Sequence, residues 1–319
     1  MPPSLPRHHI RLPPHKAPLG ASRVALRALR AGVLTPVYWA RGKRAGVPGL
    51  DFRRECVGLG LRALAAPPSP RLLRLAYELL VIPIDSTRHY ELGFVWSAIK
   101  DSEPRRYADV SSPRCLPLVV LRHWPRLSAD LVNPDARDLE DTMRLVRATG
   151  LAGRAGFHAT TIEGAPLGVG RYDLVTSISV IEHIPDDRDA VRRTWDLVAP
   201  GGRLLISVPC RRAGREERID VDHYGVLDRG PDGFYFHQWV YDRALLEERF
   251  FSTTGVPRRL ELWGERDDGA LRRRLDRQWS DPHYPFWEEP ASIAADFRQY
   301  AGFDDLPGEG VCLMEFVKD

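Results

Sequence analysis

The sequence has few cysteines and no long apolar run in its 319 residues. Four cysteines are present, far apart in the chain: Cys56, Cys115, Cys210 and Cys312. None belongs to a CxxC pair, which argues against a disulfide framework and a zinc site. Even the stretch 72–84 is broken by Arg74 and Glu78, and it falls short of the ~20 residues that a membrane-spanning helix needs. We therefore expect a globular protein of a reducing compartment, the cytoplasm.

Acidic residues are missing from the first fifty positions, which carry nine of the 46 Lys and Arg residues. We expect the proline-rich residues 1–20 to be disordered and residues 21–33 to form a short helix with Arg23, Arg27 and Arg30 on one side. Such an arm suits a weak contact with an anionic membrane surface, which would make the protein peripheral there. Nucleic acid is disfavoured as a partner, and a solvated arm without a partner is the alternative.

The stretch 171–209 has the pattern strand, turn, helix, turn, strand. Residues 172–177 are short, apolar and partly β-branched, and Pro200 with two glycines ends the helix before the buried-type strand 203–209. Two parallel strands joined by a helix form a right-handed crossover, and ligands bind beyond the carboxyl ends of such strands. The sequence therefore predicts that residues 177–183 line a site.

The runs YDLVTSISVIEHIP and PGGRLLISVP, on either side of this helix, carry a resemblance to a known family. They resemble the fourth and fifth strands of class I S-adenosylmethionine-dependent methyltransferases. The resemblance covers residues 107–319 and implies a Rossmann-like, doubly wound α/β fold with a seven-stranded sheet, an antiparallel last strand and S-adenosylmethionine as cofactor. We expect the sixth strand at 259–263 and the last at 311–318. An ordinary βαβ unit of another doubly wound enzyme is the alternative.

We expect three parts in the chain. These are a basic N-terminal arm with a short helix at 1–50, a helical cap at 51–105 and the Rossmann-like methyltransferase domain at 106–319. Two apolar helical stretches of the cap are separated by a proline-rich break at 66–70. The cap is thus a helical extension on the N-terminal side of the domain.

The polar connector 82–92 precedes the domain. Asp85 or Ser86 is expected to cap a helix that ends at Ile99. Arg88 is expected to face the cofactor from above, with plain capping and surface ion pairs as the alternative. Arg88 or Arg114 could then bind the cofactor's carboxylate.

The turn after the first strand departs from the family pattern. Asp109 ends the strand, as an acid does in the family, but Ser111, Ser112 and Pro113 stand where the family has glycines. Missing Cβ atoms let the backbone approach the cofactor, and serine is small enough to preserve much of that approach. Pro113 removes an amide donor. The resemblance still places Asp109, Ser111 and Ser112 at the cofactor.

Further cofactor residues are expected at the ends of the next strands. Asp130 lies about 20 residues after Asp109, where the family's ribose-binding acid stands, and a helix-capping role is the alternative. Thr160 and Thr161 follow the third strand, where the family often has an acid that meets the adenine amino group, and a hydroxyl would accept that bond more weakly. Ser177 and Ser179 complete the expected cofactor site.

Methyl transfer from a sulfonium is an in-line displacement, in which the protein aligns the acceptor and removes a proton from a hydroxyl. His183 is the expected base and His223 the second candidate, whereas a hydrogen-bonded structural role is the alternative for His183. The long charged stretch 210–233 is expected to hold the acceptor, a small molecule or a glycan, and a purely packing role is the alternative. Asp220, Asp222 and His223 lack a second cluster of ligands, so we predict no metal site.

Two other classes of function fit parts of the sequence. A binding or scaffold protein that has lost the cofactor would explain Pro113. A nicotinamide-dependent dehydrogenase would use Asp130, but it needs a glycine-rich phosphate turn that residues 111–115 do not provide. Asp130, Ser177, Glu182 and His183 favour the methyltransferase.

Overall fold

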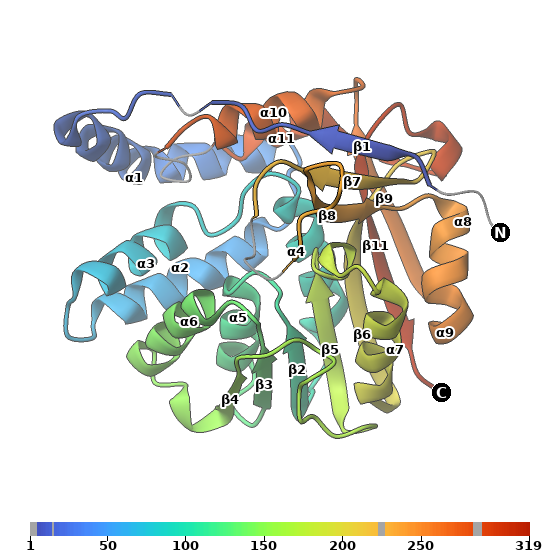
Figure 1. Ribbon diagram of the computed structural model, residues 1–319. Coiled ribbons are helices and arrows are strands. Elements are labelled where there is room, and N and C mark those ends of the chain that lie inside the picture. The colour runs from blue at the N-terminus through green and yellow to red at the C-terminus, as the bar shows by residue number, and fades with distance from the viewer. Residues whose placement is uncertain (1–4, 15, 223–226, 283–288) are drawn as a thin grey trace.

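A central sheet organises the computed structural model, which describes residues 5–14, 16–222, 227–282 and 289–319. Its strands are β2 (Arg106–Val110), β3 (Ser128–Val132), β4 (Ala155–His158), β5 (Tyr172–Ile178), β6 (Val198–Cys210), β9 (Arg259–Glu265), β10 (Phe297–Tyr300) and β11 (Gly310–Val317). They lie in the order β10-β9-β11-β6-β5-β2-β3-β4 (Figure 1). β11 is antiparallel to both β6 and β9. The predicted doubly wound sheet with an antiparallel last strand is confirmed, and β10 adds an eighth strand at its edge.

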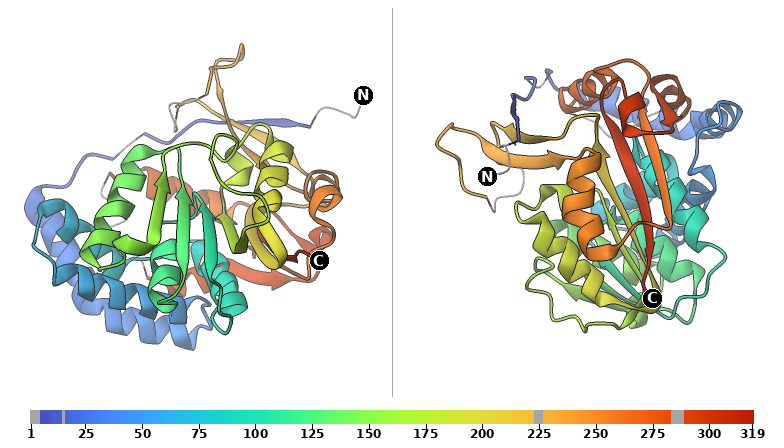
Figure 2. Two further views of the ribbon diagram at one scale, coloured as in Figure 1. Left: turned by 90° about the horizontal axis from the view of Figure 1, so that it is seen from below. Right: turned by 90° about the vertical axis from the view of Figure 1, so that its right-hand side faces the viewer.

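Helices cover both faces of this sheet (Figure 2). One face carries α4 (Arg88–Ile99), α5 (Cys115–His123) and α6 (Ala136–Ala148), and the other carries α7 (Asp187–Leu197), α8 (Arg243–Leu246), a π turn (Glu247–Phe251) and α9 (Ser252–Thr254). Each face has its own core. In β5 the neighbours Leu174 and Val175 belong to different cores, because successive strand residues point to opposite faces.

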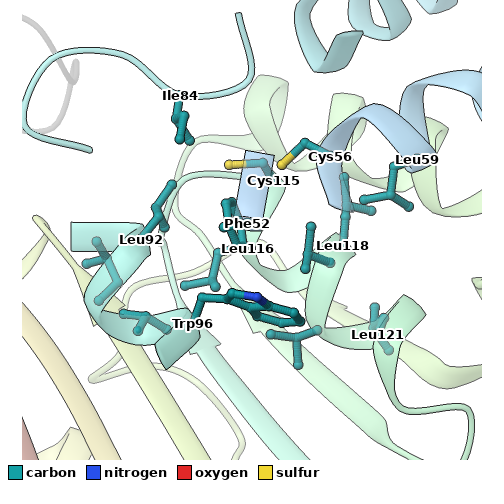
Figure 3. Packing of buried hydrophobic residues seen from close by; sticks show 14 of the residues in the cluster. Phe52, Cys56, Leu59, Ile84, Leu92, Trp96, Cys115, Leu116, Leu118 and Leu121 are labelled. Carbon is teal, nitrogen blue, oxygen red and sulfur yellow. The ribbon is translucent and has the colours of Figure 1, made fainter. Parts of the chain in front are cut away.

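The predicted helical cap consists of α2 (Leu50–Leu64) and α3 (Pro70–Val81), which lead to α4. Ser69 caps α3 by accepting a hydrogen bond from the Leu72 amide (3.2 Å), and the predicted break lies between the two helices. Figure 3 shows Phe52 and Cys56 of α2 packed close to Cys115 and Leu116 of α5. The cap therefore shares one core with the sheet, and its division from the domain at residue 106 stays a prediction.

The N-terminal arm is more ordered than its composition predicts. β1 (Arg7–Ile10) pairs in parallel with β7 (Arg215–Ile219), which pairs with β8 (Tyr235–Val240) in an antiparallel hairpin. The prediction of disorder over 1–20 is therefore wrong for this strand, because the edge of β7 offers it backbone partners. Arg7 also pairs with Glu216 (3.2 Å). β7 lies within the charged stretch 210–233 and β8 follows it, and the hairpin that they form projects from the sheet in the right-hand view of Figure 2.

The predicted short helix is also longer in the structure. α1 (Ala21–Arg44) continues eleven residues beyond position 33, through Pro36, and packs against α11 (Ala291–Asp296). α10 (Ala270–Trp279) lies in the same upper layer (Figure 1). Short turns of 3-10 helix lie at Ala152–Arg154, Ile181–His183 and Phe303–Asp305. Within the described ranges, no helix is long and apolar enough to cross a membrane.

Candidate cofactor and acceptor site

The carboxyl ends of β5 and β6 are covered by two elements, the start of α4 and the β7–β8 hairpin (Figure 1). In an open parallel sheet this edge, near the point where strand order reverses, is where ligands bind. β2 lies at that point, because β3 and β4 follow it on one side and β5 and β6 on the other. Polar side chains close to this edge are therefore the candidates for contact with a ligand.

A buried carboxylate, Glu91, fastens α4 to the strand ends. It is fully buried, and its Oε1 atom accepts hydrogen bonds from the hydroxyls of Ser207 on β6 (2.7 Å) and Ser179 just beyond β5. Its Oε2 atom accepts a bond from Arg88 Nη1 (2.9 Å). The Ser179 amide also donates to the Ser207 carbonyl oxygen (3.1 Å). The structure thus brings the predicted residues Arg88 and Ser179 together through Glu91 and Ser207.

His183 lies in the 3-10 turn that follows β5, with its Nδ1 atom 2.8 Å from the backbone carbonyl oxygen of His237 on β8. A carbonyl oxygen only accepts, so Nδ1 is the donor, and in the neutral ring Nε2 carries the lone pair. That Nε2 atom lies 3.9 Å from Glu182 Oε1. The geometry prepares Nε2 to accept a proton.

Glu182 is almost completely buried beside His183. Burial raises the pKa of its carboxyl group to about 8, with the nearby Glu91 adding to the rise and Arg88 opposing it. Its Oε2 atom has no hydrogen-bond partner among the described residues. The carboxyl group is therefore largely protonated near neutral pH, although it stands beside an arginine.

Asp109 is turned into the sheet instead of toward a ligand. Its Oδ1 atom accepts bonds from Tyr107 OH (2.9 Å) and Thr176 Oγ1 (2.6 Å), and its Oδ2 atom accepts one from the Ser112 amide (3.1 Å). Burial raises the pKa of Asp109 to about 6. The carboxyl group of Asp109 therefore braces the turn from within the sheet, and its expected contact with the cofactor stays a prediction.

The turn after β2 has the backbone shape of a glycine turn without the glycines. Ser111 has φ +52°, and both its amide and its hydroxyl donate to the Val132 carbonyl oxygen (2.9 and 3.1 Å). Ser112 is buried and its hydroxyl accepts a bond from the Ile178 amide (3.2 Å). The two serines therefore tie the end of β2 to the ends of β3 and β5.

Three serines have a positive φ, which residues other than glycine rarely adopt. In the described part of the chain, the non-glycine residues with positive φ are Ser86 (46°), Ser111 (52°) and Ser179 (51°). They lie just before α4, just after β2 and just after β5. Ser111 and Ser179 thus hold an uncommon backbone conformation at the candidate site, a form of local strain that often accompanies functional turns.

Asp130 does not end its strand. β3 runs on to Val132, and Asp130 lies mid-strand opposite Ala108. Its carboxylate accepts a bond from Tyr172 OH (3.0 Å) and lies 2.9 Å from His158 Nε2. The prediction that Asp130 ends its strand is therefore wrong by two residues, and its contact with a ribose stays a prediction.

The remaining predicted residues are spread over the sheet edge and the core. Thr160 and Thr161 follow β4 in a loop, where the Thr160 amide donates to the His158 carbonyl oxygen (2.9 Å). Ser177 is fully buried within β5, and its hydroxyl has no hydrogen-bond partner among the described residues. His223 lies outside the described residues.

Arg114 is turned away from the edge and binds Asp138 on α6 (3.0 Å from Nε). Its Nη1 atom lies 3.3 Å from Asp141 Oδ2. These ion pairs favour Arg88 over Arg114 as the partner of the cofactor's carboxylate, and both assignments stay predictions. In the described parts of the chain, no three His, Cys, Asp or Glu residues are grouped as metal ligands.

Two cavities lie apart from these residues. One of about 370 Å³ is bounded by Arg212, Arg243 and Phe303, and one of about 620 Å³ lies between Leu72 of α3 and Arg147 of α6. Neither has lining residues from the turn after β2 or the 3-10 turn after β5. The chemistry gathers at the strand ends, so the polar side chains there define the candidate site.

Residues 100–253 match the family model described as a methyltransferase domain. The sheet order, with antiparallel β11 between β6 and β9, agrees with that match. Residues 100–253 form a methyltransferase domain. S-adenosylmethionine is the cofactor of this methyltransferase family.

Parts of the chain are similar in sequence to characterised O-methyltransferases. The chloroplastic tocopherol O-methyltransferase of Arabidopsis thaliana is 33% identical over 97 residues, which are 30% of this chain and 28% of that protein. The ubiquinone biosynthesis O-methyltransferase of Bordetella avium is 27% identical over 157 residues, 48% of this chain and 56% of that protein. The chain thus spans between about a quarter and about half of the length of these two relatives.

Solved structures resemble the methyltransferase as well. The geranyl diphosphate C-methyltransferase of Streptomyces coelicolor A3(2) aligns with a TM-score of 0.46 at 12% identity. The alignment covers 81% of this chain and 84% of that chain.

The methyltransferase's own residues fit S-adenosylmethionine on the methionine side. Ser111 adopts the left-handed conformation that glycine favours, and Arg88 lies over the same edge. The ribose side differs from the family pattern, because Val132 ends β3 and the next polar residue is Asn133. Asn133 Nδ2 donates to Asp138 Oδ2 (3.0 Å) and Oδ1 accepts from the Asp135 amide (2.9 Å), which leaves the second Nδ2 hydrogen and one Oδ1 lone pair for a ribose.

Proposed function

We propose that this protein transfers a methyl group from S-adenosylmethionine to a hydroxyl group of a small molecule or glycan. The observation that carries the proposal is the Nε2 atom of His183, whose lone pair is set by the bond from Nδ1 to the His237 carbonyl oxygen. This atom lies within the matched domain, at the carboxyl edge where ligands of such sheets bind. The names of the curated relatives, both O-methyltransferases, support a hydroxyl acceptor.

The residues divide into holding and proton-transfer roles. Bound S-adenosylmethionine supplies an electrophilic methyl group. Ser111 and Ser112 leave the backbone of the turn approachable, and Arg88 offers its guanidinium group to the cofactor's carboxylate. Ser179 is linked to Arg88 through Glu91, whose carboxylate accepts hydrogen bonds from both side chains.

The adenine and ribose contacts come from the next loops. We assign Thr160 and Thr161, which follow β4, to the adenine side. We assign Asn133, the residue that directly follows β3, to the ribose side, where the family has an acid. A neutral amide binds hydroxyl groups less strongly than a carboxylate does, so ribose recognition should be weaker than in the family pattern.

His183 accepts the proton of the acceptor's hydroxyl as the methyl group is transferred. The imidazolium that forms keeps its Nδ1 bond to His237 and lies beside Glu182. The acceptor enters beneath the β7–β8 hairpin, because the hairpin supplies the carbonyl oxygen that orients the base. His223 stays a second candidate for the base.

We also propose a weak contact of the basic N-terminal arm with anionic membrane surfaces. The first fifty residues carry no acidic side chain to offset their cations. Attraction of this kind is screened by salt, so the contact should be strongest at low ionic strength. The protein would then be cytoplasmic and peripheral at the membrane.

A binding protein that has lost catalysis is the second candidate. It is favoured by Pro113 in the turn and by the absence of an acid at the end of β3, where Val132 stands. Calorimetric titration with S-adenosylmethionine, S-adenosylhomocysteine and NAD separates the candidates. The proposal predicts micromolar binding of the first two, about −8 kcal/mol, and none of NAD. A protein that binds neither sulfur ligand is no methyltransferase.

Transfer itself is tested with tritiated S-adenosylmethionine and a panel of phenols and saccharides. Label on an acceptor oxygen supports the proposal, whereas cofactor binding without transfer to any hydroxyl favours the binding protein. The role of Arg88 is tested with methylthioadenosine, which lacks the cofactor's carboxylate. Arg88→Ala should narrow the difference in affinity between the two ligands, and Arg114→Ala, whose side chain faces α6, should leave it unchanged.

A further inference from the structure

Four branched apolar side chains stand exposed along α1. Leu26 is 66% exposed, Leu29 65%, Val33 68% and Val37 50%. Their spacing of three or four residues places them on one face of the helix. Single exposed apolar residues are common, but a continuous stripe on one helix marks a surface that meets an apolar partner.

The opposite face of α1 holds the helix to the protein. Ala31 and Gly42 are buried, and the Ala28 carbonyl oxygen accepts a bond from Tyr77 OH of α3 (2.9 Å). Helical geometry turns about 100° per residue, which puts these residues roughly opposite the stripe. α1 lies at the outer edge of the helical layer (Figure 1). The stripe therefore faces outward because the other face is already occupied.

Cations border the stripe. α1 contains no acidic residue, and Arg23 and Arg30 are exposed on the flank next to Val37. Arg27 lies farther round the helix, whereas Arg41 lies on the same side as Arg23, and the two reach Asp281 (4.0 Å) and Glu289 (2.8 Å) of the protein. The last turn adds Lys43 and Arg44. An apolar stripe flanked by cations is complementary to the surface of an anionic bilayer.

We infer that α1 is an in-plane docking helix for anionic lipid bilayers, with the stripe Leu26, Leu29, Val33 and Val37 inserted at the boundary of headgroups and acyl chains. Arg23 and Arg30 then meet the lipid phosphates and carboxylates. The inference rests on the N-terminal contact proposed above and is independent of methyl transfer. The apolar stripe adds a contribution to the binding free energy that salt does not screen. A second copy of the chain is a poorer occupant, because two such faces would bring arginines together.

The test is co-sedimentation of the full chain with vesicles of phosphatidylcholine, with and without phosphatidylserine. The wild type should bind the anionic vesicles and retain part of that binding at high salt. The variant Leu26→Ser/Leu29→Ser/Val33→Ser/Val37→Ser should bind them at least about tenfold more weakly. The matched control is Val169→Ser/Val256→Ser, which removes two apolar side chains that are 74% and 83% exposed elsewhere and should bind as the wild type does.

A charge variant separates the two contributions. Arg23→Gln/Arg30→Gln should weaken binding to anionic vesicles and leave the salt-resistant part. All these side chains are exposed, so thermal unfolding should occur at the wild-type temperature and exclude misfolding as the cause. The inference is overturned by a wild type that ignores anionic vesicles, or by a serine variant that binds as well as the control. It is equally overturned if the wild type is a dimer that the serine variant dissociates while vesicle binding stays unchanged.

Discussion

His183 and His237 are joined by a hydrogen bond between the Nδ1 atom of the first and the carbonyl oxygen of the second, at 2.8 Å. The bond connects the end of β5, in the methyltransferase core, to a hairpin strand 54 positions later in the chain. The two rings are 5.4 Å apart. Because the bond uses the backbone of His237, it fixes the tautomer of His183 whatever side chain stands at position 237.

Replacing the proposed base should separate chemistry from binding. His183→Asn should lower the rate of methyl transfer about 100-fold or more, because loss of a general base typically costs that much. The affinity for S-adenosylhomocysteine should stay within about twofold of the wild type. His123→Asn, at the exposed end of α5, is the control and should leave the rate unchanged. An equal loss of rate and of cofactor affinity in His183→Asn would assign this residue to binding.

The raised pKa of Glu182 makes stability depend on pH. The folded protein holds a proton there up to about pH 8, whereas an unfolded glutamate releases it near its usual pKa of about 4.5. The contribution is therefore complete below about pH 4.5 and is lost as the pH rises to about 8, with an upper size of about 5 kcal/mol.

Denaturant unfolding of Glu182→Gln and of the wild type, measured between pH 5 and pH 8, compares their stabilities. The variant cannot ionise, so its free energy of unfolding should rise relative to the wild type between pH 5 and pH 8. Glu140→Gln on α6, at an exposed position, should follow the wild type at every pH. Parallel curves for Glu182→Gln and the wild type would show that Glu182 ionises normally in the fold.

Backbone strain at Ser111 should be measurable with two variants. Ser111→Ala and Ser111→Gly lose the same hydrogen bond to Val132, but only glycine relaxes the positive φ. The glycine variant should be more stable than the alanine variant by about 1 kcal/mol. At Ser97, inside α4, the alanine variant should instead be more stable than the glycine variant by about 1 kcal/mol, because glycine weakens helices. The same order at both positions would place Ser111 in an ordinary conformation.

The buried pair of Glu91 and Arg88 should matter far more than an exposed pair of the same types. Glu91→Leu leaves the Arg88 guanidinium group and two serine hydroxyls without their acceptor, and should destabilise the fold by about 3 to 5 kcal/mol. Glu78→Leu, which breaks the Arg74 pair on the outside of α3, should cost less than about 1 kcal/mol. Thermal unfolding of the two variants measures the two losses of stability. Equal losses would show that Glu91 has no special structural role.

Local patterns in the sequence predicted most of the sheet. The strands at 172–177, 203–209, 259–263 and 311–318 were placed correctly, because apolar runs bounded by glycine, proline or capping residues leave few alternatives. The same patterns placed Ser179 and His183 beyond a strand end, where chain order alone determines position. The end of the second strand lies two residues beyond the predicted end at Asp130, because local patterns locate strand ends only to within a few residues. The role of Asp130 at a ribose stays a prediction.

Tertiary structure decided the partners of these residues. Ser207 lies 116 positions from Glu91, and β1 joins β7 across 209 positions between Arg7 and Glu216, distances over which no local periodicity operates. The charge and apolar content of residues 21–44 can be read directly, but which face of α1 stays exposed depends on where α3 and α11 pack. The sequence by itself determined the order of elements and the chemistry available at the edge of the sheet. Only the packed chain decided which side chains meet there, because burial and long-range hydrogen bonds exist only after the elements have come together.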